Sequence, residues 1–212
     1  MALRDYEAWH DAYERPGSPL HLRLLVVQDL IARALDELSA GPLRVISICA
    51  GQGRDIVTVA RRHRRGREVS GRLVEILPAN VAEARRRIAA AGLDGLEVVQ
   101  ADAGRSDAYA GAVPANVVLA CGVFGNVSRD DIEATIAFLP RLCAPGAWVV
   151  WTRRPGGDDT IVPAIEGWLS RAGFAGQALV VPDDGSYAVG AARLDGEPRP
   201  FAPRQHLFRF AR

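Results

Sequence analysis

The 212-residue sequence contains no lysine, one methionine and three cysteines. Its 26 cationic residues are therefore all arginine, which we interpret as a codon bias of the genome rather than as a functional signal. Cys49, Cys121 and Cys143 lack Cys-x-x-Cys spacing. The sequence therefore predicts neither a disulfide framework nor a zinc site, and we expect no metal.

Long apolar runs and a strong excess of one charge are also missing. No run approaches the roughly 20 apolar residues needed to span a bilayer. The first residues carry acids and aromatics where a signal peptide would have an apolar core. A net charge of +1 gives no case for a polyanionic partner. We therefore expect a cytoplasmic protein without a membrane or nucleic-acid partner; the sequence leaves its oligomeric state open.

What the sequence does contain is a regular alternation of short apolar runs with helical segments. The runs are rich in Val, Ile and Leu, as expected for strands that are covered on both faces. Their repetition predicts an α/β fold with a doubly wound, mostly parallel sheet and helices on both faces. We expect strands at 44–49, 71–75, 96–100, 116–121 and 147–152, and helices at 54–64, 78–91, 129–143 and 160–172.

The two ends of the chain depart from this alternation. Residues 4–14 form an aromatic helix candidate, and Ser18-Pro19 has the N-cap and first-turn signature of a second helix. Near the other end, the strand-like runs 187–194 and 206–210 have no helix between them. We expect these two runs to pair as an antiparallel hairpin at one edge of the sheet.

The first strand candidate leads into a glycine-containing turn, Cys49-Ala-Gly-Gln-Gly53. Gly51 and Gly53 allow the backbone to approach a ligand closely, and the free N–H groups of the next helix favour an anionic group. The alternative is a tight turn that binds nothing.

Acidic residues close the next two strands. Glu75 follows Gly53 by about 20 residues, the interval at which an acid meets a ribose. Asp102 and the N–H of Ala103 follow the third strand and could read an adenine edge. The alternatives are a solvated acid at Glu75 and a helix cap at Asp102. Ile56 occupies the third glycine position of the NAD fingerprint, which counts against a dinucleotide.

These motifs together resemble those of class I S-adenosylmethionine-dependent methyltransferases, in particular a bacterial subset, from about residue 40 to the end. The glycine turn resembles motif I, Leu73–Asn80 resembles motif II, and Val99–Ala103 resembles motif III. The resemblance implies a Rossmann-like, seven-stranded sheet with an antiparallel C-terminal hairpin. It also implies one domain over 1–212, with residues 1–40 as a helical lid and 41–212 as the cofactor-binding core.

The resemblance implies specific contacts with S-adenosyl-L-methionine. Gly51 and Gly53, beside Ala50, would face the methionyl part. Glu75 would hold the ribose diol, and Asp102 with Ala103 would hold the adenine. Cys121-Gly122, after the fourth strand, would lie beneath the sulfonium.

Two residues depart from motif I of this family. Ser47 stands where an acid is usual, and Cys49 stands where a glycine is usual. Asp55, just inside the next helix, could supply the missing charge.

Catalytic candidates come from the N-terminal segment. His10 is the candidate base, and Tyr13 and Arg23 could reach the cofactor carboxylate from the lid. The alternative is that the aromatic residues only pin the helix to the core. Asn126 either contacts the acceptor or caps the next helix, and Arg153-Arg154 either meets an acidic acceptor or is solvated.

The sequence therefore predicts a methyltransferase acting on a small-molecule acceptor, because no inserted domain is available for a large substrate. Two alternatives stay open. One is an NAD-dependent oxidoreductase, and the other is an S-adenosylmethionine-binding protein that does not transfer methyl groups.

Overall fold

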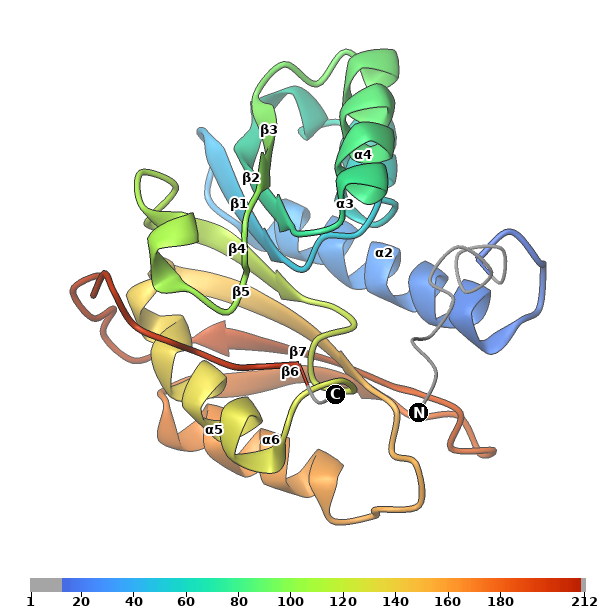
Figure 1. The fold of residues 1–212 in the computed structure, drawn as a ribbon, viewed down its shortest axis with the longest axis vertical. Helices are drawn as coiled ribbons and strands as arrows, with labels where there is room; N and C mark the ends of the chain where they lie inside the picture. The colour runs from blue at the N-terminus through green and yellow to red at the C-terminus, as the bar shows by residue number, and fades with distance from the viewer. Residues whose placement is uncertain (1–12, 211–212) are drawn as a thin grey trace.

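A computed structural model describes residues 13–210 as a seven-stranded sheet between two layers of helices (Figure 1). The strand order is β3-β2-β1-β4-β5-β7-β6. The strands are β1 (Leu43–Ile48), β2 (Val69–Glu75), β3 (Leu96–Gln100), β4 (Ala115–Ala120), β5 (Cys143–Arg153), β6 (Phe174–Val180) and β7 (Ala188–Leu194). The helices are α2 (Pro19–Glu37), α3 (Ile56–Arg62), α4 (Pro78–Ala91), α5 (Arg129–Phe138) and α6 (Ile161–Arg171).

Both faces of the sheet are apolar because successive side chains of each central strand point in opposite directions. In β1, Ile46 faces the core beneath α5 and α6. Its neighbour Val45 faces the core beneath α2, α3 and α4. The predicted three-layer α/β arrangement is confirmed, and each parallel strand predicted between residues 44 and 152 is present.

Parallel pairing places the carboxyl ends of strands β1 to β5 on the same side of the sheet. β1 pairs in parallel with β2 on one side and with β4 on the other, so the strand order reverses at this point. In open α/β sheets the crevice outside such a reversal is where ligands bind. The topology therefore places the glycine turn after β1 at the centre of that crevice.

Helix α2 begins as predicted: the Ser18 side chain accepts a hydrogen bond from His21 N at 3.1 Å, and Pro19 is the first helical residue. Helix α5 ends earlier than predicted, at Phe138 rather than 143. Pro140 cannot donate a helical hydrogen bond, and residues Leu139–Arg141 form a 3₁₀ turn instead. The aromatic helix predicted at 4–14 lies almost entirely outside the described residues; Tyr13 and Glu14 lie in a turn.

The antiparallel C-terminal edge is present, but one of its strands was predicted wrongly. β7 pairs with β5 and with β6, so the hairpin is formed by β6 and β7 rather than by 187–194 and 206–210. The chain after β7 contains Pro198, Pro200 and Pro203, which lack the N–H groups that a ladder needs.

The last described residues form a separate feature, which we call the C-terminal strap (residues 204–210). It makes single bridges from His206 to Arg105 and from Phe210 to Val127. Figure 1 shows this dark red segment running back across the molecule toward the loop between β4 and α5. The strap thus links the loop after β3 to the loop after β4.

Candidate active site

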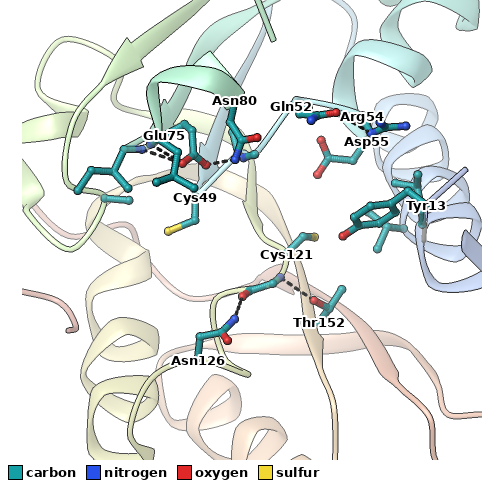
Figure 2. A pocket seen from close by; sticks show the side chains of 18 of the residues that line it. Tyr13, Cys49, Gln52, Arg54, Asp55, Glu75, Asn80, Cys121, Asn126 and Thr152 are labelled. Carbon is teal, nitrogen blue, oxygen red and sulfur yellow. Dashed lines mark hydrogen bonds between the residues drawn. The ribbon is translucent and has the colours of Figure 1, made fainter. Parts of the chain in front are cut away.

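A cavity of about 330 Å³ lies at the carboxyl ends of β1, β2, β3, β4 and β5. The N-terminal part of α2 and the turn before it complete its wall through Tyr13, Arg23, Leu24 and Val27. Figure 2 shows three groups of side chains around it: Glu75 with Cys49, Asp55 with Tyr13, and Cys121 with Thr152 and Asn126. The cavity therefore has three chemically different ends.

The glycine turn after β1 forms the cavity floor in a left-handed backbone conformation. Cys49, Gly51 and Gly53 have φ values of 54°, 55° and 66°. For a residue with a Cβ atom this conformation costs about 1 kcal/mol, so Cys49 is strained where the methyltransferase motif has glycine. Burial raises the pKa of the Cys49 thiol, which keeps it neutral and unreactive.

Glu75 is fixed by backbone donors at the first end of the cavity. Its Oε2 accepts from Gly51 N at 2.8 Å, and its Oε1 accepts from Ile76 N at 2.9 Å and from Leu77 N at 2.8 Å. Two ionised oxygens offer about four acceptor positions, so the carboxylate keeps acceptor capacity for a ligand. The same bonds tie the glycine turn to the end of β2.

Asp102 and Ala103 lie at the same end, after β3. Asp102 Oδ1 accepts from Gly104 N at 2.8 Å, so the residue shapes a turn and does not cap a helix. The buried Ala103 is held through its carbonyl oxygen, which accepts from Tyr109 Oη at 2.6 Å. Ile76 and Leu77 also line this end and are 53% and 37% exposed. Apolar surface and carboxylates together suit a flat heterocycle that carries hydroxyl groups.

Asp55 forms the second end of the cavity with Tyr13 and Arg23. It lies at the N-terminus of α3, and its Oδ1 accepts from Ile56 N at 2.7 Å. Burial raises the pKa of the Asp55 carboxyl, against the lowering effects of its backbone hydrogen bonds and of Arg23. Arg23 also donates to Tyr13 Oη at 2.7 Å, and burial raises the pKa of that phenol. A buried carboxylate of this kind is suited to a cationic ligand group.

We expect Asp55→Asn to stabilise the ligand-free protein at neutral pH, because it removes a buried charge and keeps an oxygen for Ile56 N. A raised folded-state pKa means that the wild type loses stability as the pH rises through that pKa. The advantage of the variant should therefore be present at pH 7.5 and vanish near pH 4, close to the pKa of an unfolded aspartate at about 3.9. Thermal unfolding of both proteins between pH 4 and pH 7.5 measures this difference in stability. Equal melting temperatures of the wild type and Asp55→Asn at pH 7.5 would contradict the prediction.

The third end is formed by the loop after β4 and the end of β5. Gly122 has φ 87°, and its N–H donates to the buried Thr152 Oγ1 at 2.8 Å. Asn126 Nδ2 donates to the Gly122 carbonyl oxygen at 2.7 Å. Burial raises the pKa of the Cys121 thiol, so this cysteine is not an activated nucleophile. Asn126 fastens the loop rather than capping α5, whose N-cap is Ser128.

Most of the sequence-predicted site residues line this one cavity. They are Tyr13, Ala50, Gly51, Glu75, Asp102, Ala103, Cys121 and Gly122. Gly53 instead lies behind the wall, where a Cβ atom would come within 2.9 Å of Leu73 Cδ2 and 3.2 Å of Val57 Cγ2. It allows close packing of α3 on the sheet. His10 lies outside the described residues.

Ser47, which departs from the methyltransferase motif, and Asp55, which could supply the missing charge, have different positions in the structure. Ser47 is buried in β1 and is not part of the cavity wall, whereas Asp55 is. Arg153 does not line the cavity either. Its guanidinium donates to the Phe124 carbonyl oxygen and so stabilises the loop after β4.

Sequence reasoning missed Thr152 and Phe210 as cavity residues. Thr152 could have been found from its place at the end of a parallel strand. No local signal marks Phe210, because the strap reaches the cavity only through long-range contacts.

Within residues 13–210, no group of three or more His, Cys, Asp or Glu side chains is arranged to hold a metal ion. Over the same residues, no helix is both long and apolar enough to cross a bilayer.

Solved structures share this fold. An O-methyltransferase family protein from Burkholderia thailandensis has a TM-score of 0.66 and 20% identity over 94% of this chain, which spans 61% of that protein's length. Magnesium protoporphyrin IX methyltransferase from Synechocystis PCC 6803, with bound SAM, has a TM-score of 0.66 and 14% identity over 90% of this chain and 91% of its own.

An RNA methyltransferase from Salinibacter ruber in complex with S-adenosyl-L-homocysteine has a TM-score of 0.52. It is 20% identical, over 84% of this chain and 95% of its own. No curated protein matches the chain. The sequence family described as "Putative methyltransferase" matches residues 18–163, which is more than half of the sequence and contains β1–β5 with the glycine turn. The chain belongs to this methyltransferase family.

Proposed function

We propose that the protein is an S-adenosylmethionine-dependent methyltransferase that acts on a small-molecule acceptor. The observation that carries this proposal is the division of one cavity into three ends: a carboxylate pair beside apolar surface, a buried acid with an arginine, and the uncharged loop after β4 with the end of β5. The acidic side chains of the cavity fit the cofactor, because carboxylates accept hydrogen bonds from ribose hydroxyls and attract an ammonium group.

The cavity residues then have separate roles. Glu75 accepts from the ribose diol, and Asp102 with the N–H of Ala103 holds the adenine. Asp55 faces the ammonium group at the other end, where Arg23 and Tyr13 are placed for the carboxylate. Asp55 thereby supplies the charge that Ser47 lacks.

Catalysis in such a site rests mainly on alignment. When bound, S-adenosylmethionine would supply an activated methyl group: the acceptor atom would form a bond to the methyl carbon as the carbon–sulfur bond breaks, and S-adenosylhomocysteine would be the leaving group. The chain holds the two reactants in that geometry, which removes much of the entropic barrier. At the third end of the cavity, the hydrogen bond from Gly122 N–H to Thr152 Oγ1 fixes the loop backbone beside which the acceptor would bind.

We also propose residues 1–40 as a lid on a core of residues 41–212, with His10 as the base for an acceptor that must lose a proton. Tyr13, three residues further on, already lines the cavity. His10→Ala should leave S-adenosylhomocysteine affinity unchanged and lower kcat by about 10²–10⁴-fold. Calorimetry and turnover assays separate the two effects, and unchanged turnover would remove His10 from this role.

Ile56 favours this cofactor over NAD. It occupies the place of the third fingerprint glycine and is the fully buried first residue of α3, where a dinucleotide site would need a glycine for close helix–strand packing. The alternative of binding without methyl transfer is favoured by Cys49, whose strained backbone departs from the motif.

Calorimetric titration with S-adenosylmethionine, S-adenosylhomocysteine and NAD tests the cofactor. We expect binding of the first two and none of NAD; the reverse would contradict the proposal. Mass spectrometry of mixtures with candidate acceptors then tests transfer, and a protein that binds the cofactor but yields no methylated product supports the binding-only alternative.

We further propose a cytoplasmic location with neither membrane nor nucleic acid as partner, in keeping with the net charge of +1.

A further inference from the structure

The C-terminal strap delivers one aromatic side chain to the cavity. Phe210 lines the cavity and is 42% exposed. Its ring packs edge-on against that of the buried Phe208, with 5.6 Å between the two ring centroids. The strap lies outside residues 18–163, the part that matches the methyltransferase family. Phe210 is therefore a feature of this chain that the family match does not describe.

Contacts along the strap fix the position of Phe210. Leu207 N donates to the Gly104 carbonyl oxygen at 2.7 Å, and the Leu207 carbonyl oxygen accepts from Thr135 Oγ1 at 3.2 Å. Beside Phe210, Arg209 N donates to Asp131 Oδ2 at 3.3 Å, and Phe210 itself bridges to Val127. The Val127 bridge sets Phe210 next to the loop that contains Gly122 and Asn126, at the third end of the cavity.

This third end differs from the others in charge. Arg23, Arg54 and Asp55 line the cavity near α2 and α3, while Glu75 and Asp102 line it after β2 and β3. The side chains described at the third end are uncharged, namely Cys121, Asn126, Thr152 and Phe210. Figure 2 shows Cys121, Asn126 and Thr152 together on the side away from Glu75 and Asp55. A charged acceptor placed here would lose its water without gaining an opposite charge.

We infer that Phe210 selects a flat, uncharged, aromatic acceptor by packing against its ring at this end of the cavity. The inference rests on the proposed function, because that function assigns the other two ends to the cofactor. Aromatic pairs gain from ring geometry beyond the area that they bury. The strap thus acts as the specificity-determining part of the site.

The test uses 2-naphthol as a neutral flat probe, 2-naphthoate as its charged counterpart and decahydro-2-naphthol as its non-planar counterpart. Each is titrated calorimetrically into the full chain, with and without saturating S-adenosylhomocysteine. We expect 2-naphthol to bind at least about tenfold more tightly than either counterpart. Tighter binding of 2-naphthoate would overturn the inference.

Phe210→Ala should weaken 2-naphthol binding by about tenfold or more, and Phe210→Trp should retain it. Phe210→Leu keeps apolar volume without a ring, so its affinity for 2-naphthol should be close to that of Phe210→Ala. If Phe210→Ala is poorly folded, the affinity of Phe210→Leu tests the inference instead. Leu179→Ala is the matched control, because Leu179 is 41% exposed on the edge strand β6 and does not line the cavity. It should bind the probe as the wild type does.

Affinity for S-adenosylhomocysteine should change by less than about twofold in every Phe210 variant. Unchanged 2-naphthol binding in Phe210→Ala and Phe210→Leu would overturn the inference. A wild-type protein that fails to bind S-adenosylhomocysteine would contradict the proposed function instead. The 2-naphthol titrations in the absence of S-adenosylhomocysteine would still test the role of Phe210.

Discussion

Glu75→Ala should weaken S-adenosylhomocysteine binding by about 3 kcal/mol, on the order of a hundredfold, because hydrogen bonds to a charged group contribute about 1.5–3 kcal/mol each. One such bond is lost, from the ribose diol to the acceptor position that the three backbone donors leave free. The variant also frees Gly51 N, Ile76 N and Leu77 N, whose acceptor is the Glu75 carboxylate. Both effects act on the same end of the cavity, and calorimetry measures their sum.

Asp102→Ala is the comparison for this prediction. Asp102 accepts one backbone hydrogen bond, from Gly104 N, and is exposed. Its loss should cost about 1–2 kcal/mol of binding free energy, less than the loss of Glu75. Glu75→Gln keeps one acceptor oxygen and should fall between the wild type and Glu75→Ala. Unchanged affinity in Glu75→Ala and Asp102→Ala would refute the cofactor site.

Arg65→Ala should lower the free energy of unfolding by about 3 kcal/mol, because it leaves one buried and three partly buried carbonyl groups without this donor. The Arg65 guanidinium donates to the carbonyl oxygens of Leu35, Leu38 and Ser39 at 2.6–2.8 Å. It also donates to the Gly41 carbonyl oxygen, and its side chain is 8% exposed. The arginine thereby fastens the C-terminal end of α2, whose other end lines the cavity. Urea denaturation followed by circular dichroism measures the loss.

The adjacent Arg64 provides a matched control. Its side chain is 71% exposed and pairs with Asp36 at 2.6 Å. Exposed ion pairs contribute about 0–1 kcal/mol, so Arg64→Ala should be nearly neutral. Arg65→Lys keeps the charge but offers one compact ammonium instead of a planar fork, and should not restore the stability. Equal stability of Arg65→Ala and Arg64→Ala would contradict this role for Arg65.

The central part of the fold could be predicted because its signal is local. Each strand from β1 to β5 is a short apolar run covered on both faces, and proline or glycine punctuation separates these runs from the helices. The edge strand β6 was missed because its sequence, FAGQALV, mixes small and polar residues with few β-branched ones. An edge strand is covered on fewer sides, so its composition is under weaker constraint.

The candidate site was predictable to the extent that parallel strands end at one edge of the sheet. That rule, together with the resemblance to the methyltransferase motifs, predicted that Glu75, Asp102 and Cys121 surround one cavity, and all three line it. Gly53 does not line the cavity, and the sequence could not show this, because it cannot distinguish a glycine that faces a ligand from one that leaves room for the Leu73 side chain. Phe210 escaped prediction because long-range contacts of the strap determine where it lies: Phe210 bridges to Val127, and Leu207 N donates to the Gly104 carbonyl oxygen.

A crystal structure of the protein with S-adenosyl-L-homocysteine tests the central claim most directly. We predict the ribose hydroxyls at Glu75, the adenine beside Ile76 and the Asp102-Ala103 turn, and the amino group at Asp55. The sulfur should lie between Gly51 in the glycine turn and Cys121 in the loop after β4. Density for the nucleoside at any other place, or a Glu75 carboxylate that makes no contact with it, would contradict the account.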